Sequence, residues 1–130
     1  MRFFVKLSRG TMLTQKQETG SEGEKWAEKF LKKKKKYKIL DKNWRHKNGE
    51  IDIIAQDGEV TVFVEVRTRR KNALVSGYFS VTKKKKLALK PVLQEYIRQN
   101  NLKYFRFDII EIAYDGENFE IFHYENVPFF

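Results

Sequence analysis

Two carboxylates and one cation lie close together in the pattern of a predicted β-hairpin. Asp52 belongs to the first apolar run, residues 49–54, and Glu65 and Arg67 belong to the second, residues 62–67. Acidic side chains on an otherwise apolar sheet are costly to bury without a positive partner. In a chain whose formal net charge is +10, this combination suggests a metal ion held against a phosphate group. The chemistry predicted from these residues is metal-dependent hydrolysis of a phosphodiester bond.

The turn of this hairpin predicts which side chains share a face. Asp57-Gly58 between two apolar runs is typical of a two-residue type I′ loop. With that loop, Asp52 pairs with Phe63, and Glu50 pairs with Glu65. Side chains alternate between the two faces of a strand, so one face is predicted to carry Glu50, Asp52, Ile54, Thr61, Phe63, Glu65 and Arg67. The other face is predicted to be a core surface made of Ile51, Ile53, Val60, Val62, Val64 and Val66.

The repulsion within this group of acids needs compensation. Asp52 and Glu65 become diagonal neighbours, and two negative charges ~5 Å apart repel by ~3 kcal/mol at an effective dielectric of ~20. Mg²⁺ or Mn²⁺ would supply the positive charge, because Mg²⁺ typically takes one or two carboxylates and completes its shell with water and phosphate oxygens. A network of ion pairs between the acids, Arg67 and nearby lysines is the alternative, and strand pairing alone does not decide between the two.

Length and composition limit the setting. A chain of 130 residues without cysteine is long enough for one domain with a real core, and it offers neither disulfides nor thiolate metal ligands. The sequence carries no apolar run of membrane-spanning length and no secretory signal at its start, so we expect a cytoplasmic protein with no membrane partner. Met12 is an alternative start, and we expect residues 1–19 to be an N-terminal extension outside the fold and residues 20–130 to form a single domain.

Lysine and arginine are clustered along the chain. Basic runs lie at residues 32–36, 67–71 and 83–86. Clustered positive charge is typical of nucleic-acid binding. Lysines at a helix end are also often only a solvated face, and a heat-adapted host would favour them as well. DNA is the predicted partner, and the residues expected to contact it are Arg45, Arg69, Arg70, Lys71, Lys83 and Lys85.

The expected order of elements is helix, three strands, helix, two strands. Ser21 and Glu24 match a capping box at the start of the first helix, and an apolar stripe follows at helical spacing. The remaining predicted elements are a strand at 37–45, the hairpin, a polar connection at 68–77, a second helix from 81–82 onward that contains Pro91, strands at 104–112 and 119–124, and an aromatic tail at 127–130 packed against the body.

Several separated motifs resemble one bacterial family. They are Gly23-Glu24 and Ala27, Asn43 and Arg45, Gly49-Glu50-Ile51-Asp52-Ile53-Ile54-Ala55 with Asp57, Phe63-Val64-Glu65-Val66-Arg67-Thr68-Arg69, and Arg106-Phe107-Asp108. Together they resemble the YraN family of uncharacterised endonuclease-like proteins, over nearly the whole chain after about residue 20. The resemblance implies an α/β fold of the restriction-endonuclease-like kind, with a mixed central β-sheet flanked by α-helices. Such domains form the PD-(D/E)XK superfamily, and the archaeal Holliday-junction resolvases are close relatives.

The resemblance also implies a role for each matching residue. Asp52 and Glu65 take the two acidic positions that hold Mg²⁺ or Mn²⁺, and Glu24 is the helical acid that completes the metal site. Arg67 occupies the position of the superfamily lysine. Because a guanidinium stays protonated, Arg67 can supply only charge, and the ion must lower the pKa of the attacking water. Glu50 is placed behind the ligands as a supporting residue.

The implied activity is that of a Mg²⁺-dependent endonuclease, and residues 20–130 would be its nuclease-like domain. Branched or single-stranded DNA in recombination, repair or DNA uptake is the expected substrate. With Arg67 in the lysine position, a catalytically inactive nucleic-acid-binding accessory protein is the alternative, and RNA is an alternative to DNA. Because resolvases act as pairs, a homodimer is one expected assembly.

Some of these residues also have purely structural interpretations. Glu24 would then serve only the capping box, which is the more common role for a residue at that position. Glu50 would be a hydrogen-bonding strand residue. Asp108 is left outside the site, where it would orient Arg106 or cap a loop.

Overall fold

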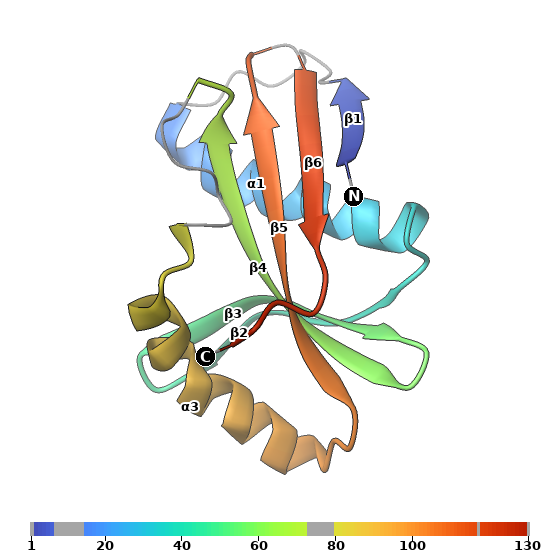
Figure 1. The fold of residues 1–130 in the computed structure, drawn as a ribbon, viewed down its shortest axis with the longest axis vertical. Coiled ribbons are helices and arrows are strands. Elements are labelled where there is room, and N and C mark those ends of the chain that lie inside the picture. The colour runs from blue at the N-terminus through green and yellow to red at the C-terminus, as the bar shows by residue number, and fades with distance from the viewer. Residues whose placement is uncertain (1, 7–14, 73–79, 117, 130) are drawn as a thin grey trace.

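A six-stranded β-sheet between two helices forms the framework of the protein (Figure 1). The computed structural model describes the backbone of residues 2–6 and 15–21 and all atoms of residues 22–72, 80–116 and 118–129. In these ranges the elements are β1 (Arg2–Lys6), α1 (Gln15–Lys33), β2 (Lys38–His46), β3 (Gly49–Asp57), β4 (Val60–Arg70), α3 (Lys83–Asn100), β5 (Phe105–Tyr114) and β6 (Asn118–Tyr124). Their order matches the prediction, with β1 as an added strand at the start.

The sheet is mixed, with the strand order β1-β6-β5-β4-β3-β2. β4 and β5 run parallel, and every other neighbouring pair runs antiparallel. The connection from β4 to β5 contains α3, in keeping with the long crossover that a parallel pair requires. The predicted α/β fold with a mixed central sheet and flanking helices is confirmed. It is consistent with a restriction-endonuclease-like domain.

Each face of the sheet carries its own hydrophobic core. On one face, Ala27, Phe30 and Leu31 of α1 follow helical spacing and are buried against β3, β4, β5 and β6. On the other face, α3 packs against β3 and the neighbouring strands, and Figure 1 shows it beside β2 and β3, at the opposite end of the molecule from α1. The predicted inward residues of α3 are confirmed, since Leu89, Val92, Leu93 and Tyr96 are buried and Ile97 is partly buried.

Both helices are amphipathic. Their apolar residues lie toward the sheet, and most of their lysines are exposed. In the described parts of the chain, neither helix combines the length and the apolar character needed to cross a membrane.

The central hairpin turns one residue later than predicted. Asp57 pairs with Val60, so Gly58 occupies the first position of the loop. Gly58 has a φ of 60°, and glycine in that position with a positive φ is typical of a type II′ turn. The predicted loop of Asp57 and Gly58 is therefore wrong, because glycine is needed at the first loop position here.

This later turn shifts the strand pairing by two residues. Phe63 pairs with Ile54 and does not pair with Asp52 as predicted. The ladder ends at the Ile53–Val64 pair, and the side chains of the next residues, Asp52 and Glu65, are in contact. Because the shift is an even number of residues, each residue of β4 keeps its predicted face.

The predicted single core face of the hairpin is wrong, because both faces are buried. Ile53 packs in the α1 core, whereas Ile51 and Ile54 pack in the α3 core. The alternation of side chains is interrupted between Ile51 and Ile53. Asn43 of β2 lies opposite this interruption with a φ of 50°. The irregularity therefore falls at Asp52.

The N-terminal part of the chain adds a strand and lengthens the first helix. β1 pairs antiparallel with β6 at the edge of the sheet. α1 begins at Gln15, so Ser21 lies inside the helix, and the predicted helix start with its capping box is wrong. Both elements include backbone of the expected extension, residues 1–19. The division of the chain at residue 20 stays a prediction.

The structure also tests three predictions for the second half of the chain: the second helix, the polar connection before it and the aromatic tail. α3 follows the N-cap residue Thr82 as expected, and it contains Pro91 without ending there. The polar connection is wrong for residues 68–70, which belong to β4, while residues 73–79 lie outside the described residues. The aromatic tail packs against the body as predicted, since the rings of Phe107 and Phe129 lie 4.8 Å apart.

Candidate metal centre

Four carboxylates from three elements meet beside the central hairpin. Glu24 of α1 and Glu50 and Asp52 of β3 each bring one oxygen within 4.8 Å of the others. Glu65 of β4 joins them through side-chain contact with Asp52. We call Glu24, Glu50, Asp52 and Glu65 the acidic cluster. The structure thus brings together the three predicted ligands and the predicted supporting residue Glu50.

A main-chain contact fixes Asp52 within the sheet. The backbone N–H of Val66 in β4 donates a hydrogen bond of 2.8 Å to Asp52 Oδ2. Backbone pairing between β3 and β4 stops one residue before it would reach Asp52. An oxygen of the Asp52 carboxylate therefore accepts a hydrogen bond where a backbone carbonyl would accept it in a regular ladder. This bond bridges the two strands and holds Asp52 beside Glu65.

Asn43 connects the helix to the hairpin. Its Nδ2 donates to Glu24 Oε1 at 2.9 Å and to Glu50 Oε1 at 3.0 Å. Asn43 adopts a left-handed backbone conformation with a φ of 50°, which asparagine tolerates better than most residues. Glu24 therefore bonds to Asn43 and does not cap the start of α1.

A close approach between α1 and β4 places Glu24. Gly23 packs directly on Thr68, and a Cβ at Gly23 would lie 2.0 Å from Thr68 Oγ1. Any larger residue at this position would push the helix away from the strand unless Thr68 moved. Gly23 thus sets the distance at which the neighbouring Glu24 reaches the hairpin.

Asp52 and Glu24 of the acidic cluster hold protons more tightly than ordinary carboxylates do. Burial, followed by contact with Glu65, raises the pKa of Asp52 to about 8. Burial and then the charge of Asp52 raise the pKa of Glu24 to about 6. Each raised pKa shows that a negative charge on that carboxyl group is unfavourable at its position. The cluster is therefore short of positive charge.

Two cations approach the cluster without hydrogen-bonding to it. Arg67 Nη2 lies 3.6 Å and Lys85 Nζ lies 3.7 Å from Glu65 Oε2, which is too long for a hydrogen bond. Among the described residues, three buried side-chain atoms have no hydrogen-bond partner: Glu65 Oε2 and Arg67 Nε beside this cluster, and the ring nitrogen His123 Nδ1 elsewhere. Buried polar atoms are rarely left in this state. The alternative interpretation, in which a network of ion pairs neutralises the acids, therefore applies only in part, because these contacts leave Glu65 Oε2 without a hydrogen bond.

The cluster opens into a cleft between the hairpin and α3. The cleft has a volume of about 420 Å³ and exposes Glu50, Asp52, Glu65 and Lys85 on its wall. Residues 46–49 of the β2–β3 turn form one side of it, and the first turns of α3 form the other. A ligand can therefore reach the carboxylates from solvent.

The donor set fits a divalent cation. Mg²⁺ and Mn²⁺ prefer carboxylate oxygens. Glu24, Glu50 and Asp52 bring oxygens within 4.8 Å of one another, and Glu65 contacts Asp52 beside them. The raised pKa values of Asp52 and Glu24 show that added positive charge would be favourable. The buried Glu65 Oε2, which lacks a hydrogen-bond partner in the described part of the chain, is the atom that such an ion would satisfy.

The predicted DNA contacts lie in different places, and of these six residues Lys85 lines the cleft. Arg45 is exposed and donates a hydrogen bond of 2.6 Å to Glu50 Oε2, so it borders the acidic cluster. Lys83 is exposed at the first residue of α3. Arg69 pairs with the buried Glu111 of β5, and this pair joins two strands of the sheet, so Arg69 has a structural role there.

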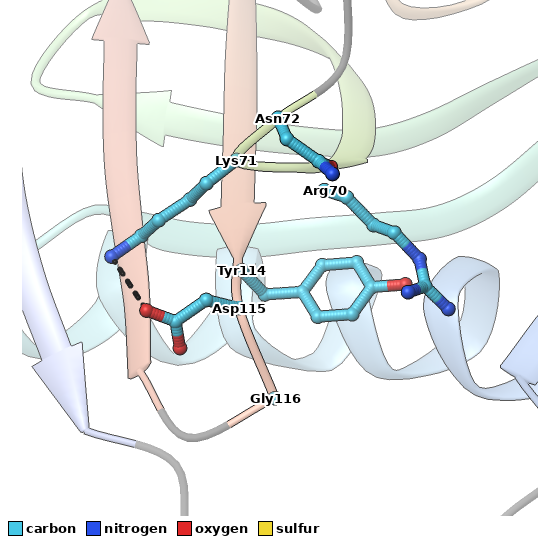
Figure 2. Close-up of a pocket in the computed structure, with 6 residues that line it drawn as sticks. All are labelled: Arg70, Lys71, Asn72, Tyr114, Asp115 and Gly116. Atoms are coloured by element: carbon cyan, nitrogen blue, oxygen red, sulfur yellow. Dashed lines mark hydrogen bonds and ion pairs between the residues drawn. The ribbon is translucent and has the colours of Figure 1, made fainter.

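Arg70 and Lys71 lie in a different place, at the far end of β4 (Figure 2). They line a pocket of about 370 Å³ with Asn72, Tyr114, Asp115 and Gly116. The Arg70 guanidinium lies 5.9 Å from the centre of the Tyr114 ring, and Lys71 Nζ lies 3.3 Å from Asp115 Oδ2. Because Arg70 is five residues beyond Glu65, the pocket is ~16 Å from the acidic cluster along the strand.

Comparison with known proteins identifies the family. A model described as "Uncharacterised protein family UPF0102" matches residues 23–112, a range that contains the whole acidic cluster. The chain belongs to the UPF0102 family. Similar UPF0102 proteins include one from Carboxydothermus hydrogenoformans, 42% identical over 114 residues that cover 86% of this chain and 96% of that protein. Another, from Sulfurihydrogenibium sp., is 48% identical over 92 residues that cover 69% of this chain and 76% of that protein. The resemblance to YraN-like proteins is confirmed.

Sequence reasoning missed two contributors to the site of this UPF0102 protein. Asn43 belonged to the motifs that carry the resemblance but received no role, since only the fold brings it between Glu24 and Glu50. Gly23 likewise had no role, because its contact with Thr68 joins a helix to a distant strand. A glycine inside an amphipathic helix is a signal of close packing, and it could have pointed to this contact.

Proposed function

We propose that this UPF0102 protein is a metal-dependent DNA endonuclease that hydrolyses phosphodiester bonds. One observation carries the proposal: four carboxylates converge at an open cleft, and the buried Glu65 Oε2 lies between two cations without a hydrogen bond from any described residue. Such an arrangement is unfavourable by itself and becomes favourable when a divalent cation and a phosphate group are added.

Mg²⁺ or Mn²⁺ would be held by Asp52, Glu65 and Glu24, with Glu50 supporting Asn43 and Arg45 beside them. When bound, such an ion neutralises charge on the phosphate and activates a water for attack. The hydrogen bond from Val66 keeps Asp52 in place for this task. Asn43 keeps Glu24 turned toward the hairpin.

Arg67 would bind the scissile phosphate. Its Nη2 lies 3.6 Å from Glu65 Oε2, and its buried Nε has no hydrogen-bond partner in the described residues. A guanidinium can therefore donate to a phosphate oxygen while it stays close to the carboxylate. Because it remains protonated, Arg67 stabilises charge and does not take a proton from water.

DNA is the proposed substrate because of the charge around the cleft. The chain carries a formal net charge of +10, and exposed Arg45 and Lys83 lie near the acidic cluster. Arg70 and Lys71 provide further positive charge along β4. Branched or single-stranded DNA in recombination, repair or DNA uptake remains the proposed substrate class.

A catalytically inactive nucleic-acid-binding protein is the second candidate function. The presence of Arg67 in the position of the superfamily lysine favours it, because the site then lacks a lysine from that strand. Both candidates predict DNA binding that weakens with salt. Only the endonuclease predicts cleavage that depends on a divalent cation.

The test is an incubation of the purified protein with single-stranded, duplex, flapped and four-way-junction DNA, with Mg²⁺, Mn²⁺ or EDTA. We expect cleavage of at least one DNA only when the cation is present. Asp52→Ala and Glu65→Ala should lose cleavage while they still bind DNA, and Asp115→Ala serves as a control far from the cleft. Cleavage that survives in both variants would reject this site, and binding without any cleavage would favour the accessory protein.

A further inference from the structure

Lys85 differs from its neighbours in the lysine run by its place on the helix. At 100° per residue, Lys85 aligns with Leu89 and Val92, both of which are buried against the sheet. Lys84 is turned away from this stripe by about 100°. Lys85 therefore lies at the next position of the apolar stripe of α3, at the end of the stripe nearest the cleft. A charged side chain stands there in place of an apolar one.

The packing of α3 brings this lysine to the acidic cluster. A Cβ at Gly49 would lie 2.2 Å from Val92 Cγ2 and 3.8 Å from the backbone oxygen of Ala88. The helix thus rests directly on the start of β3, one residue from Glu50 and three from Asp52 along the chain. One turn before Leu89, the Lys85 ammonium reaches 3.7 Å from Glu65 Oε2.

The Lys85 ammonium keeps its donors available for a ligand. Its distance from Glu65 is longer than a hydrogen bond, and 43% of its side chain is exposed on the wall of the cleft. Lys86, by comparison, donates a hydrogen bond of 2.7 Å to the backbone oxygen of Pro128. The helix N-cap is already satisfied by Thr82, which accepts from the Lys85 backbone, so the ammonium has no capping task.

The positive charge of Lys85 also gains no stabilisation from α3 itself. The first turn of α3 contains no acidic residue, and cations near a helix N-terminus are unfavourable because the helix dipole is positive there. A phosphate group in the cleft would reverse that cost. Lys85 and Arg67 would then flank the phosphate from two elements, α3 and β4, with Glu65 between them.

We propose that Lys85 is a catalytic residue whose ammonium binds a non-bridging oxygen of the scissile phosphate, opposite Arg67. Lys85 thereby supplies from α3 the lysine that β4 lacks at position 67. This assignment rests on the proposed endonuclease function and deepens it. It separates Lys85 from the other lysines of the run, which contact DNA at most as general positive charge.

The experiment compares Lys85→Met with the matched control Lys84→Met, and uses three measurements. The first is the cleavage rate at saturating DNA with Mg²⁺. The second is the affinity for the same DNA with Ca²⁺, and the third is the affinity for Mn²⁺ alone by calorimetry. We expect Lys85→Met to slow cleavage by about 100-fold, as for loss of one charge-stabilising donor, while DNA affinity falls by less than about threefold. Lys84→Met should cleave at the wild-type rate.

The calorimetry decides the position of Lys85 whether or not the protein cleaves DNA. Removing a positive charge near Glu65 should tighten Mn²⁺ binding by about 3- to 10-fold in Lys85→Met, with no change in Lys84→Met. Equal Mn²⁺ affinity in Lys85→Met and the wild type, or no Mn²⁺ binding by either, would overturn the proposal. Equal cleavage by the two lysine variants would overturn it as well. If the wild type binds Mn²⁺ but cuts no DNA, the endonuclease function fails and the Mn²⁺ result still tests Lys85.

Discussion

The protein contains two groups of carboxylates with similar geometry and opposite chemistry. Among the described residues, Glu24, Glu50 and Asp52 of the acidic cluster each bring one oxygen within 4.8 Å of the others. In a second group, a carboxylate oxygen from each of Asp108 and Glu125 and a ring nitrogen of His123 lie equally close. We call the second group, together with Arg106 and Tyr37, the Asp108 network. The two groups differ in how their charge is compensated.

Every acid of the Asp108 network has direct partners. Asp108 accepts hydrogen bonds from Arg106 Nε at 3.0 Å and from the Asn126 backbone at 2.9 Å, and it lies 2.8 Å from His123 Nε2. Lys35 forms an ion pair of 2.8 Å with Glu125. This lysine lowers the pKa of Glu125. The network fastens the C-terminal segment to β5.

The acidic cluster lacks such partners where they matter most. Arg67 and Lys85 lie beyond hydrogen-bonding distance of Glu65 Oε2, and burial raises the pKa of Asp52 to about 8. Compensated carboxylates stabilise a fold, whereas carboxylates held together without compensation mark a position for a ligand. The comparison therefore separates a structural network from a candidate functional site within one sheet.

The comparison predicts opposite effects of the same substitution in the two groups. Asp108→Asn should lower the free energy of unfolding by about 3 kcal/mol, because Arg106 and His123 lose a buried partner. Asp52→Asn should raise it by about 1 kcal/mol in EDTA at pH 8, because the change removes repulsion with Glu65. Urea unfolding of both variants measures the difference. Equal destabilisation by the two substitutions would show that Asp52 is as well compensated as Asp108.

The pH dependence of stability isolates the acidic cluster. An acid whose pKa is raised on folding binds its proton more tightly in the folded state, so stability falls as pH rises. For Asp52 this loss should extend from its ordinary value of 3.8 to about 8. The wild type in EDTA should therefore lose stability relative to Asp52→Asn between pH 5 and 8, by at most about 1.4 kcal/mol for each pH unit. Thermal melts at several pH values test it, and a difference that grows with the opposite sign would contradict it.

A smaller effect is expected where α1 packs on β4. Gly23→Ala should weaken Mn²⁺ binding by about 10-fold, roughly 1.4 kcal/mol, because the new methyl group meets Thr68 Oγ1 and displaces Glu24. Removing that oxygen in the double variant Gly23→Ala with Thr68→Ala should restore the affinity. Calorimetry on both variants distinguishes displacement of Glu24 from general destabilisation, which the second substitution would not repair.

The smallest effect is expected for Arg67→Lys. Both side chains carry one positive charge, so Mg²⁺-dependent cleavage should change by less than about threefold. Arg67→Met, which removes the charge, is the matched control and should cleave much more slowly. A large gain of activity in Arg67→Lys would instead show that the natural protein is impaired by its arginine.

The sequence predicted the hairpin and the convergence of Asp52 with Glu65, because these depend on local periodicity and a glycine turn, and the fold class followed from the family resemblance. It placed the turn one residue early because the type II′ loop puts Gly58 first. It missed β1, because residues 1–19 were expected to lie outside the fold and the partner strand β6 is distant in the chain. It also missed the first residues of α1, which lack an apolar pattern.

The site was predictable only as far as its residues lie on one hairpin. Asn43 joins Glu24 to Glu50 through a left-handed kink in β2, and such a kink has no sequence period. The interpretation of Asp108 outside the site is consistent with its bonds to Arg106 and to the Asn126 backbone. What separates the two acidic groups is the presence of partners, and only the folded chain brings those partners together.

The most direct test of this account is a calorimetric titration of Mn²⁺ into the wild type, Asp52→Asn and Glu125→Gln at pH 7. The account predicts binding by the wild type with release of protons, because Asp52, whose pKa is about 8, holds a proton at pH 7 that a cation would displace. Asp52→Asn should lose this binding, and Glu125→Gln should keep it. Binding that survives in Asp52→Asn and is lost in Glu125→Gln would place the metal at the Asp108 network and contradict the account.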